Sequence, residues 1–185
     1  MIPLRDVIPT RTTPFVAIAL IGVNAIASGY VVVVGRSNVV LILWLAVNML
    51  YLWLFGENVE DRMGHGRFLV FYLFCAAAAT LVHMAAEMRT NWTTAIGGAT
   101  AGVMGGYLVL YPRSSIILLV PLVPSVRVVE VGAVYFVGMW FALQLSTGGF
   151  WADVVGFLAG AGAVVVLRRP ERQRVEWWND VIRRS

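Results

Sequence analysis

The stretch Ala95–Pro112, with the sequence AIGGATAGVMGGYLVLYP, is apolar and carries glycines spaced four residues apart at Gly98, Gly102 and Gly106. In a soluble helix each glycine would cost roughly 1 kcal/mol relative to alanine. Within a bilayer the same spacing forms a face on which helix backbones approach closely, because no side chain separates them. The stretch therefore predicts a central transmembrane helix around which other helices pack. Taken alone, the pattern requires no more than this packing role.

The composition extends this interpretation to the whole chain. Of its 185 residues, 59% are hydrophobic and only 13% are charged, which is more apolar surface than a soluble domain of this size could bury. We therefore expect a polytopic membrane protein. The single cysteine, Cys75, excludes a disulfide within the chain. All 14 basic residues are arginines, and we interpret the net charge of +4 as a sign of cytoplasmic loops rather than of nucleic-acid binding.

Six apolar runs predict six transmembrane helices with short or charged connections. The runs are residues 14–35, 39–55, 68–88, 95–112, 129–145 and 151–167. The first run is longer than the apolar core of a signal peptide. We expect residues 56–67 to form a charged loop. Residues 113–127, which Pro121 and Pro124 interrupt, are expected to form a loop in the membrane interface. The predicted fold class is an all-α membrane bundle.

Six spans put both termini on one side, and the arginines indicate which side. If residues 1–13 and the tail at residues 168–185 are cytoplasmic, 12 of the 14 arginines lie inside and only Arg36 and Arg89 lie outside. We interpret residues 14–167 as the membrane domain of a bacterial inner-membrane protein. The helical spacing of apolar residues in the tail predicts an amphipathic helix. Its candidate contacts with lipid or a partner are Trp177, Trp178, Arg183 and Arg184.

Three blocks of sequence carry a resemblance to a known family. They are NMLYLWLFGENVEDRMG at residues 48–64, GVMGGYLVLYPR at residues 102–113 and WADVVGFLAG at residues 151–160. In this order and spacing the blocks resemble the rhomboid family of intramembrane serine proteases, and the resemblance covers residues 47–167. It implies a six-helix bundle that holds a Ser–His dyad inside the membrane, where water reaches it from the outer side.

The residues that carry the family's chemistry are replaced at the matching positions. The family's G-x-S-G sequence falls on residues 95–98, so that Gly97 stands where the resemblance implies the nucleophile. Asp153 stands where it implies the histidine of the dyad. The family's H-x-x-x-N sequence falls on Trp44 and Asn48, so only the asparagine remains. The connection between the first two spans is also shortened. The resemblance therefore implies a rhomboid-like member without the catalytic dyad.

Asp153 is the most informative polar residue. It precedes Gly156 and Gly160 by three and seven residues, so we expect it to share the face that packs on the central helix. The alternatives are a carboxylate wetted or capping the helix near the outer surface, a proton or ion path, and a contact with a partner helix. A structural hydrogen bond between Asp153 and Thr100 is favoured over a catalytic pairing. We expect Asn24 to face protein rather than lipid.

The first functional hypothesis is a non-catalytic rhomboid-like protein that binds other integral membrane proteins, as a subunit of a larger complex or as an assembly factor. The second is an intramembrane protease with unconventional residues, Thr100 and Asp153. The third is a small transporter that uses Asp153, Asn48 and Asn24. His65 and His83 lie on opposite sides of the membrane in the predicted topology, so neither a metal site nor a cofactor is expected.

Overall fold

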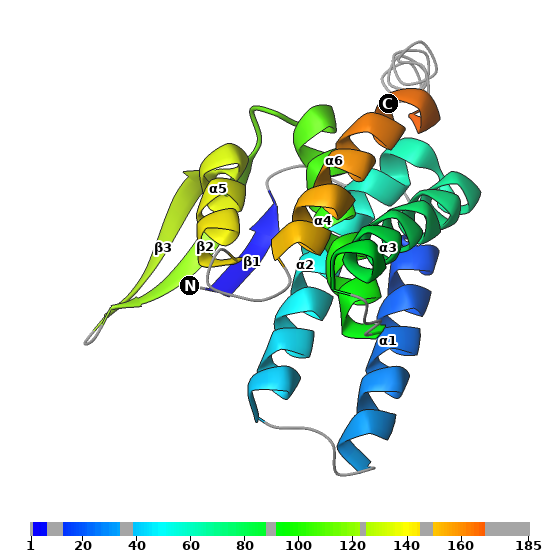
Figure 1. Ribbon diagram of the computed structural model, residues 1–185. Coiled ribbons are helices and arrows are strands. Elements are labelled where there is room, and N and C mark those ends of the chain that lie inside the picture. Colours follow the sequence, from blue (N-terminus) through cyan, green and yellow to red (C-terminus); the bar gives the residue numbers. More distant parts are fainter. Residues whose placement is uncertain are drawn as a thin grey trace.

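The computed structural model describes residues 2–6, 13–33, 39–87, 92–122, 125–144 and 150–168. These residues form six helices and a three-stranded sheet (Figure 1). In chain order the elements are β1 (Ile2–Asp6), α1 (Phe15–Val33), α2 (Val39–Met63), α3 (His65–Glu87), α4 (Trp92–Leu110), β2 (Ser115–Leu122), β3 (Ser125–Gly132), α5 (Ala133–Gln144) and α6 (Phe150–Leu167).

Four of the helices, α2, α3, α4 and α6, are long and apolar enough to cross a membrane. The chain is therefore a multi-pass membrane protein, as its composition indicates. The apolar helix α5 has 12 residues, which at about 1.5 Å per residue covers about 18 Å of a hydrocarbon core about 30 Å thick. The six helices correspond in order to the six predicted spans, and four of them are candidate membrane spans by length and hydropathy within the described residues.

Helix α4 lies at the centre of the bundle, and 67% of its apolar stretch Thr93–Leu110 is buried. It packs mainly against α6, α3 and α2. Toward α6, a Cβ atom at Gly156 or Gly160 would overlap the backbone carbonyl of α4 at Gly98 or Gly102. The glycines therefore let α4 and α6 approach with their backbones in contact, as in small-residue helix pairs of other membrane proteins.

On the side of α3, the same helix presents Gly98, Gly102 and Gly106. A Cβ atom at Gly106 would lie 2.9 Å from the Phe71 ring, and one at Gly102 would lie 2.5 Å from the Cys75 sulfur. Phe71 and Cys75 are fully buried as a result. Helix α4 is thus enclosed between α3 and α6 by close backbone approaches on two faces.

The predicted charged loop at residues 56–67 is wrong, because these residues continue two helices. Helix α2 runs to Met63 and α3 begins at His65, with only Gly64 between them. Gly64 adopts a φ of 85°, a left-handed conformation that glycine accepts without a steric penalty. The loop was predicted from its charges, but the principal carboxylate, Glu60, is fully buried and satisfied by another helix.

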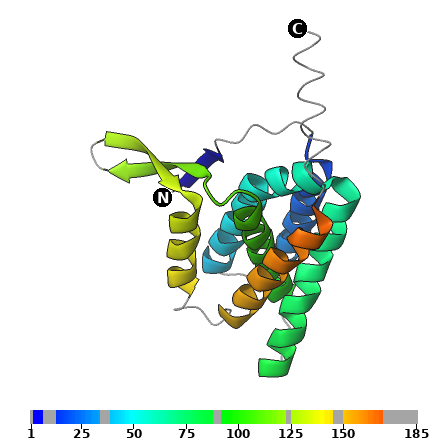
Figure 2. The same ribbon diagram turned by 90° about the horizontal axis from the view of Figure 1, so that it is seen from above.

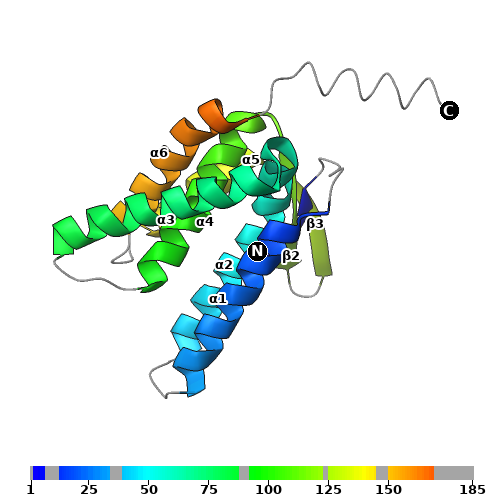
Figure 3. The ribbon, with the colours of Figure 1, turned by 90° about the vertical axis from the view of Figure 1, so that its right-hand side faces the viewer.

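Glu60 fastens the start of α1 to the end of α2. Its two carboxylate oxygens accept hydrogen bonds from the backbone N–H groups of Val16 at 2.9 Å and Ala17 at 2.7 Å. These amides belong to the first turn of α1, where no carbonyl within the helix can accept from them. His65 also lies 2.5 Å from the Glu60 carboxylate and stacks edge-on against Phe15. The contact orients α1 along α2, and the two run together past the other helices (Figure 3).

The all-α expectation holds for the six helices, but residues 2–6, 115–122 and 125–132 form a sheet. Strands β2 and β3 make an antiparallel hairpin, and β1 pairs antiparallel with β2, giving the order β1-β2-β3. The segment contains β-branched residues in quantity, such as Ile116, Ile117 and Val128, which favour strands. Pro121 is tolerated because β1 pairs with β2 only as far as Leu119.

The sheet also corrects the predicted fifth span. Residues 129–132 belong to β3, so that α5 starts at Ala133 rather than at Val129. The sheet and α5 stand together at one side of the bundle (Figures 1 and 2). The predicted amphipathic tail lies outside the described residues beyond Arg168, and with it Trp177, Trp178, Arg183 and Arg184.

Candidate functional site

Gly97 of α4, Asp153 of α6 and Trp44 of α2 meet near one end of the bundle. A Cβ atom placed on Gly97 would lie 3.0 Å from Cζ2 of Trp44 and 3.1 Å from Oδ1 of Asp153. Gly97 is buried and Trp44 is half-buried. Three helices thus bring together three of the four positions at which the family's chemical residues were expected.

Asp153 is 4% exposed and lies in the first turn of α6. Its Oδ2 atom accepts a hydrogen bond from Nε2 of Gln144, the last residue of α5. Oδ1 points to the Gly97 side and lies 3.1 Å from where a Cβ atom at Gly97 would stand. The two helices α5 and α6 are therefore linked by a polar contact inside an apolar setting, where such contacts persist because water is scarce.

Asn48 and Thr100 use their polar groups within their own helices. Asn48 is 6% exposed and donates from Nδ2 to the Trp44 carbonyl at 2.9 Å. Thr100 is fully buried and donates to the Ile96 carbonyl at 2.9 Å. The predicted hydrogen bond between Thr100 and Asp153 is therefore wrong. A threonine in a helix satisfies its hydroxyl through the carbonyl one turn earlier, which is always within reach.

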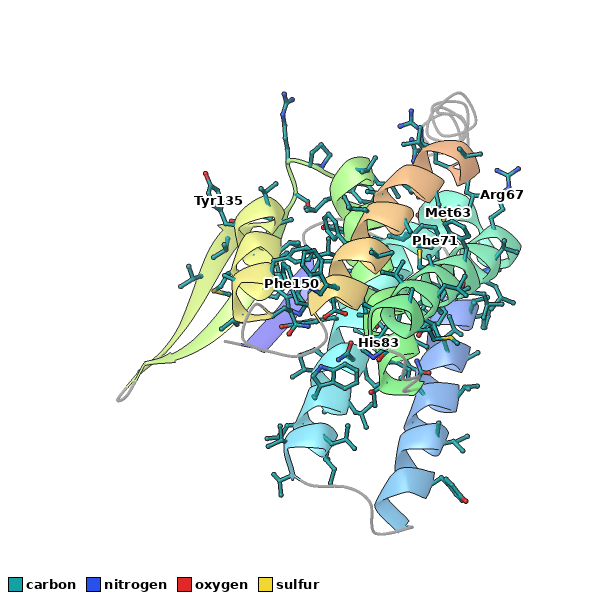
Figure 4. The ribbon with its side chains drawn as sticks, in the orientation of Figure 1. Met63, Arg67, Phe71, His83, Tyr135 and Phe150 are labelled. Atoms are coloured by element: carbon teal, nitrogen blue, oxygen red, sulfur yellow. The ribbon has the colours of Figure 1, made fainter. Side chains whose placement is uncertain are left out.

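Two further polar residues of the helices, Asn24 and His83, are buried. Asn24 of α1 is 8% exposed and donates to the Tyr72 hydroxyl of α3 at 3.1 Å, so it faces protein as expected. His83 is buried near one end of α3, and Arg67 lies near the opposite end (Figure 4). Within the described residues no group of three metal-ligating side chains comes together.

A comparison with known protein families matches the Rhomboid domain family to residues 38–170, more than half of the chain. This chain belongs to the rhomboid family. The match begins just before α2 and continues past the end of α6, so it includes every helix of the site. The resemblance found in the sequence is confirmed at the level of the family. Searches of curated proteins and of solved structures gave no match.

Within this rhomboid bundle, sequence reasoning missed Gln144. It is the one amide in the otherwise apolar run Ala133–Gln144, which was itself a signal, since an amide in a transmembrane segment needs a polar partner. The carboxylate of Asp153 needs a donor for the same reason. Pairing the two unexplained polar residues at neighbouring helix ends would have predicted the contact.

Proposed function

We propose that this rhomboid-family protein is non-catalytic and binds other transmembrane proteins, as an accessory subunit of a larger membrane complex or as an assembly factor. The observation that carries the proposal is the arrangement around Gly97. The position that faces Asp153 has no side chain, and the indole of Trp44 lies beside it.

Nucleophilic catalysis needs a hydroxyl or thiol within hydrogen-bond reach of a base. The hydroxyl of Thr100 is committed to the Ile96 carbonyl and is fully buried. The Cys75 thiol is fully buried against Gly102, one turn farther along α4. Neither group faces the Asp153 carboxylate, which supports loss of the protease reaction rather than its transfer to another residue.

A binding role is supported by the apolar faces of α1 and α2. These helices run together beyond the rest of the bundle (Figure 3), and few other elements cover them there. The exposed residues along this part are Val23, Ile26, Tyr30, Val39, Val40, Leu43 and Val47. We assign this face to partner helices and to surrounding lipid. The tail residues Trp177, Trp178, Arg183 and Arg184 remain proposed contacts with a partner or with the membrane surface.

The proposed location is a bacterial inner membrane with both termini in the cytoplasm. Four arginines flank the same end of the bundle, at the end of α2, the start of α3, and just after α4 and α6: Arg62, Arg67, Arg113 and Arg168. An excess of arginine marks cytoplasmic loops. Reporter fusions at residues 36–38 and at the C-terminus test this topology, which predicts opposite sides for the two sites.

The function is tested with the full chain purified in mild detergent and reconstituted in liposomes. We expect membrane proteins to co-purify in fixed stoichiometry, and a transmembrane reporter cleaved by an active rhomboid protease to stay intact. A lone monomer with no co-purifying protein would contradict the binding role. Cleavage of the reporter that disappears in Asp153→Ala or Thr100→Ala would instead establish a protease with unconventional residues.

A further inference from the structure

Two exposed arginines lie close together where α3 begins and α6 ends. Arg67, in the first turn of α3, donates from Nη1 to the Leu167 carbonyl at the end of α6, at 3.4 Å. Arg168 follows Leu167 directly and is also exposed. Figure 4 shows Arg67 at the end of the bundle where α6 finishes. The hydrogen bond brings the Arg67 guanidinium next to the backbone of Arg168, so two positive charges belong to one small area of the surface.

The donors of these two arginines are largely available to an anion. A guanidinium has five N–H donors in a planar fork, and the Leu167 carbonyl takes one from Arg67. The first turn of α3 contains no acidic residue, and the last turn of α6 is apolar. Arginine binds phosphate through paired N–H donors, and such charge-assisted hydrogen bonds are among the strongest in proteins.

The sequence after α6 adds further positive charge. Residues 168–174 contain four arginines and one acidic residue, Glu171, and of these only Arg168 belongs to the described part of the chain. A cluster of basic residues directly after a transmembrane helix is typical of segments that bind anionic lipid headgroups. The sequence pattern and the contact between Arg67 and the end of α6 therefore indicate the same kind of ligand.

Apolar side chains next to the two arginines favour a lipid over a free anion. On α6, Val165 and Val166 are 53% and 82% exposed. On α3, which packs against α6, Leu69 and Val70 are 39% and 60% exposed. Each helix thus carries an arginine at its end and exposed apolar side chains in the adjacent turn. A phospholipid has the same order of polarity, with a charged headgroup above apolar acyl chains.

We propose that Arg67 and Arg168 bind the phosphate of an anionic phospholipid, whose acyl chains lie along the exposed apolar side chains of α3 and α6. A headgroup with a net negative charge is preferred over a zwitterionic one, because the ammonium of the latter offsets the charge of its phosphate. The inference goes beyond the proposed function and does not depend on it, since a bound lipid is compatible with a catalytic or a non-catalytic role.

The test uses the purified full chain in detergent, with phosphatidylglycerol and phosphatidylcholine of identical acyl chains as probes. Native mass spectrometry gives the dissociation constant of the first bound lipid. We expect phosphatidylglycerol to bind about 25-fold more tightly, the product of two contributions of about fivefold from the two arginines. Arg67→Gln and Arg168→Gln should each lower this preference about fivefold. Arg113→Gln is the matched control, because Arg113 is an exposed arginine at the same end of the bundle, and it should retain the preference.

Four outcomes would overturn the inference. Equal affinity of the wild-type chain for both lipids would exclude the site. Equal losses in all three glutamine variants would show a general attraction between charges. Arg67→Lys, which keeps the charge, should retain most of the preference, and a loss as large as in Arg67→Gln would assign the effect to a disturbed helix end. Displacement of phosphatidylglycerol by inorganic phosphate at millimolar concentration would show a site for the free anion instead of a lipid.

Discussion

The indole of Trp44 lies against Gly97, with its Cζ2 and Cη2 atoms 3.0 Å and 3.4 Å from where a Cβ atom at position 97 would stand. At these distances a side chain at position 97 would fit only if the Trp44 ring moved away. The two residues come from different helices, α2 and α4, so the size of one restricts the size of the other. A large aromatic ring and a missing side chain are complementary parts of the same packing arrangement.

This complementarity predicts a coupling between the two positions. Gly97→Ala should destabilise the protein by about 1–3 kcal/mol through overpacking against the ring. In a Trp44→Ala background the same change should cost little, because the space is then open. A double-mutant cycle of thermal unfolding in detergent measures the coupling. Additive effects of the two changes would show that the ring does not restrict position 97.

The backbone contact between α4 and α6 predicts unequal effects of glycine substitutions along α6. A Cβ at Gly160 would overlap the Gly102 carbonyl, whereas a Cβ at Gly162 would meet nothing within 4 Å. Gly160→Ala should therefore separate the two helices and prevent stable folding. Gly162→Ala should be neutral or stabilise by up to about 1 kcal/mol through helix propensity. The unfolding midpoints in detergent compare the variants, and similar values would contradict the close approach.

Burial of Glu60 predicts a large effect of its removal. Glu60→Ala should lower the free energy of unfolding by about 3 kcal/mol, because the amides of Val16 and Ala17 and the ring of His65 lose their acceptor. Glu60→Gln, which retains one oxygen, should lose less. Glu130→Gln in β3 is the control, since that side chain is exposed. A loss in Glu60→Ala no larger than in this control would exclude the anchoring of α1.

The hydrogen bond between Asn24 and Tyr72 predicts a smaller effect. Tyr72→Phe should cost about 1 kcal/mol, a typical value for a polar contact between transmembrane helices. Tyr135→Phe removes the same hydroxyl from a residue that is 78% exposed on α5 and points away from the bundle (Figure 4). Its unfolding midpoint should stay at the wild-type value. An equal change in both variants would show that the hydrogen bond contributes nothing.

The membrane helices could be predicted from the sequence, because apolar runs and glycine spacing are local patterns that can be read without knowing the rest of the fold. The glycine pattern of residues 95–112 indicated the central helix, and α4 is the most enclosed of the four candidate spans. The three matched blocks set the register in which Gly97 and Trp44, which lie outside the blocks, and Asp153, which lies in the third, correspond to one site. The structure places these three residues side by side.

Features that depend on partners distant in the sequence could not be predicted in the same way. The strand β2 was taken for an interfacial loop, because an apolar segment between prolines fits either structure until its pairing with β1 and β3 is known. Glu60 was assigned to a loop because it is charged. Its burial in a helix end is explained only by its hydrogen bonds from two amides of α1, which lie 43 and 44 positions away in the sequence. Gln144 was missed for a similar reason, since its acceptor belongs to the next helix.

The pairing of β1 with β2 has a consequence for the order of assembly. Residues 2–6 are synthesised before the strand to which they bind, Ser115–Leu122, which follows four helices later. Pairing over such a long sequence separation is slow and is opposed by the entropy of closing the intervening chain. Strand β1 therefore has no partner strand until the four intervening helices and β2 have been synthesised.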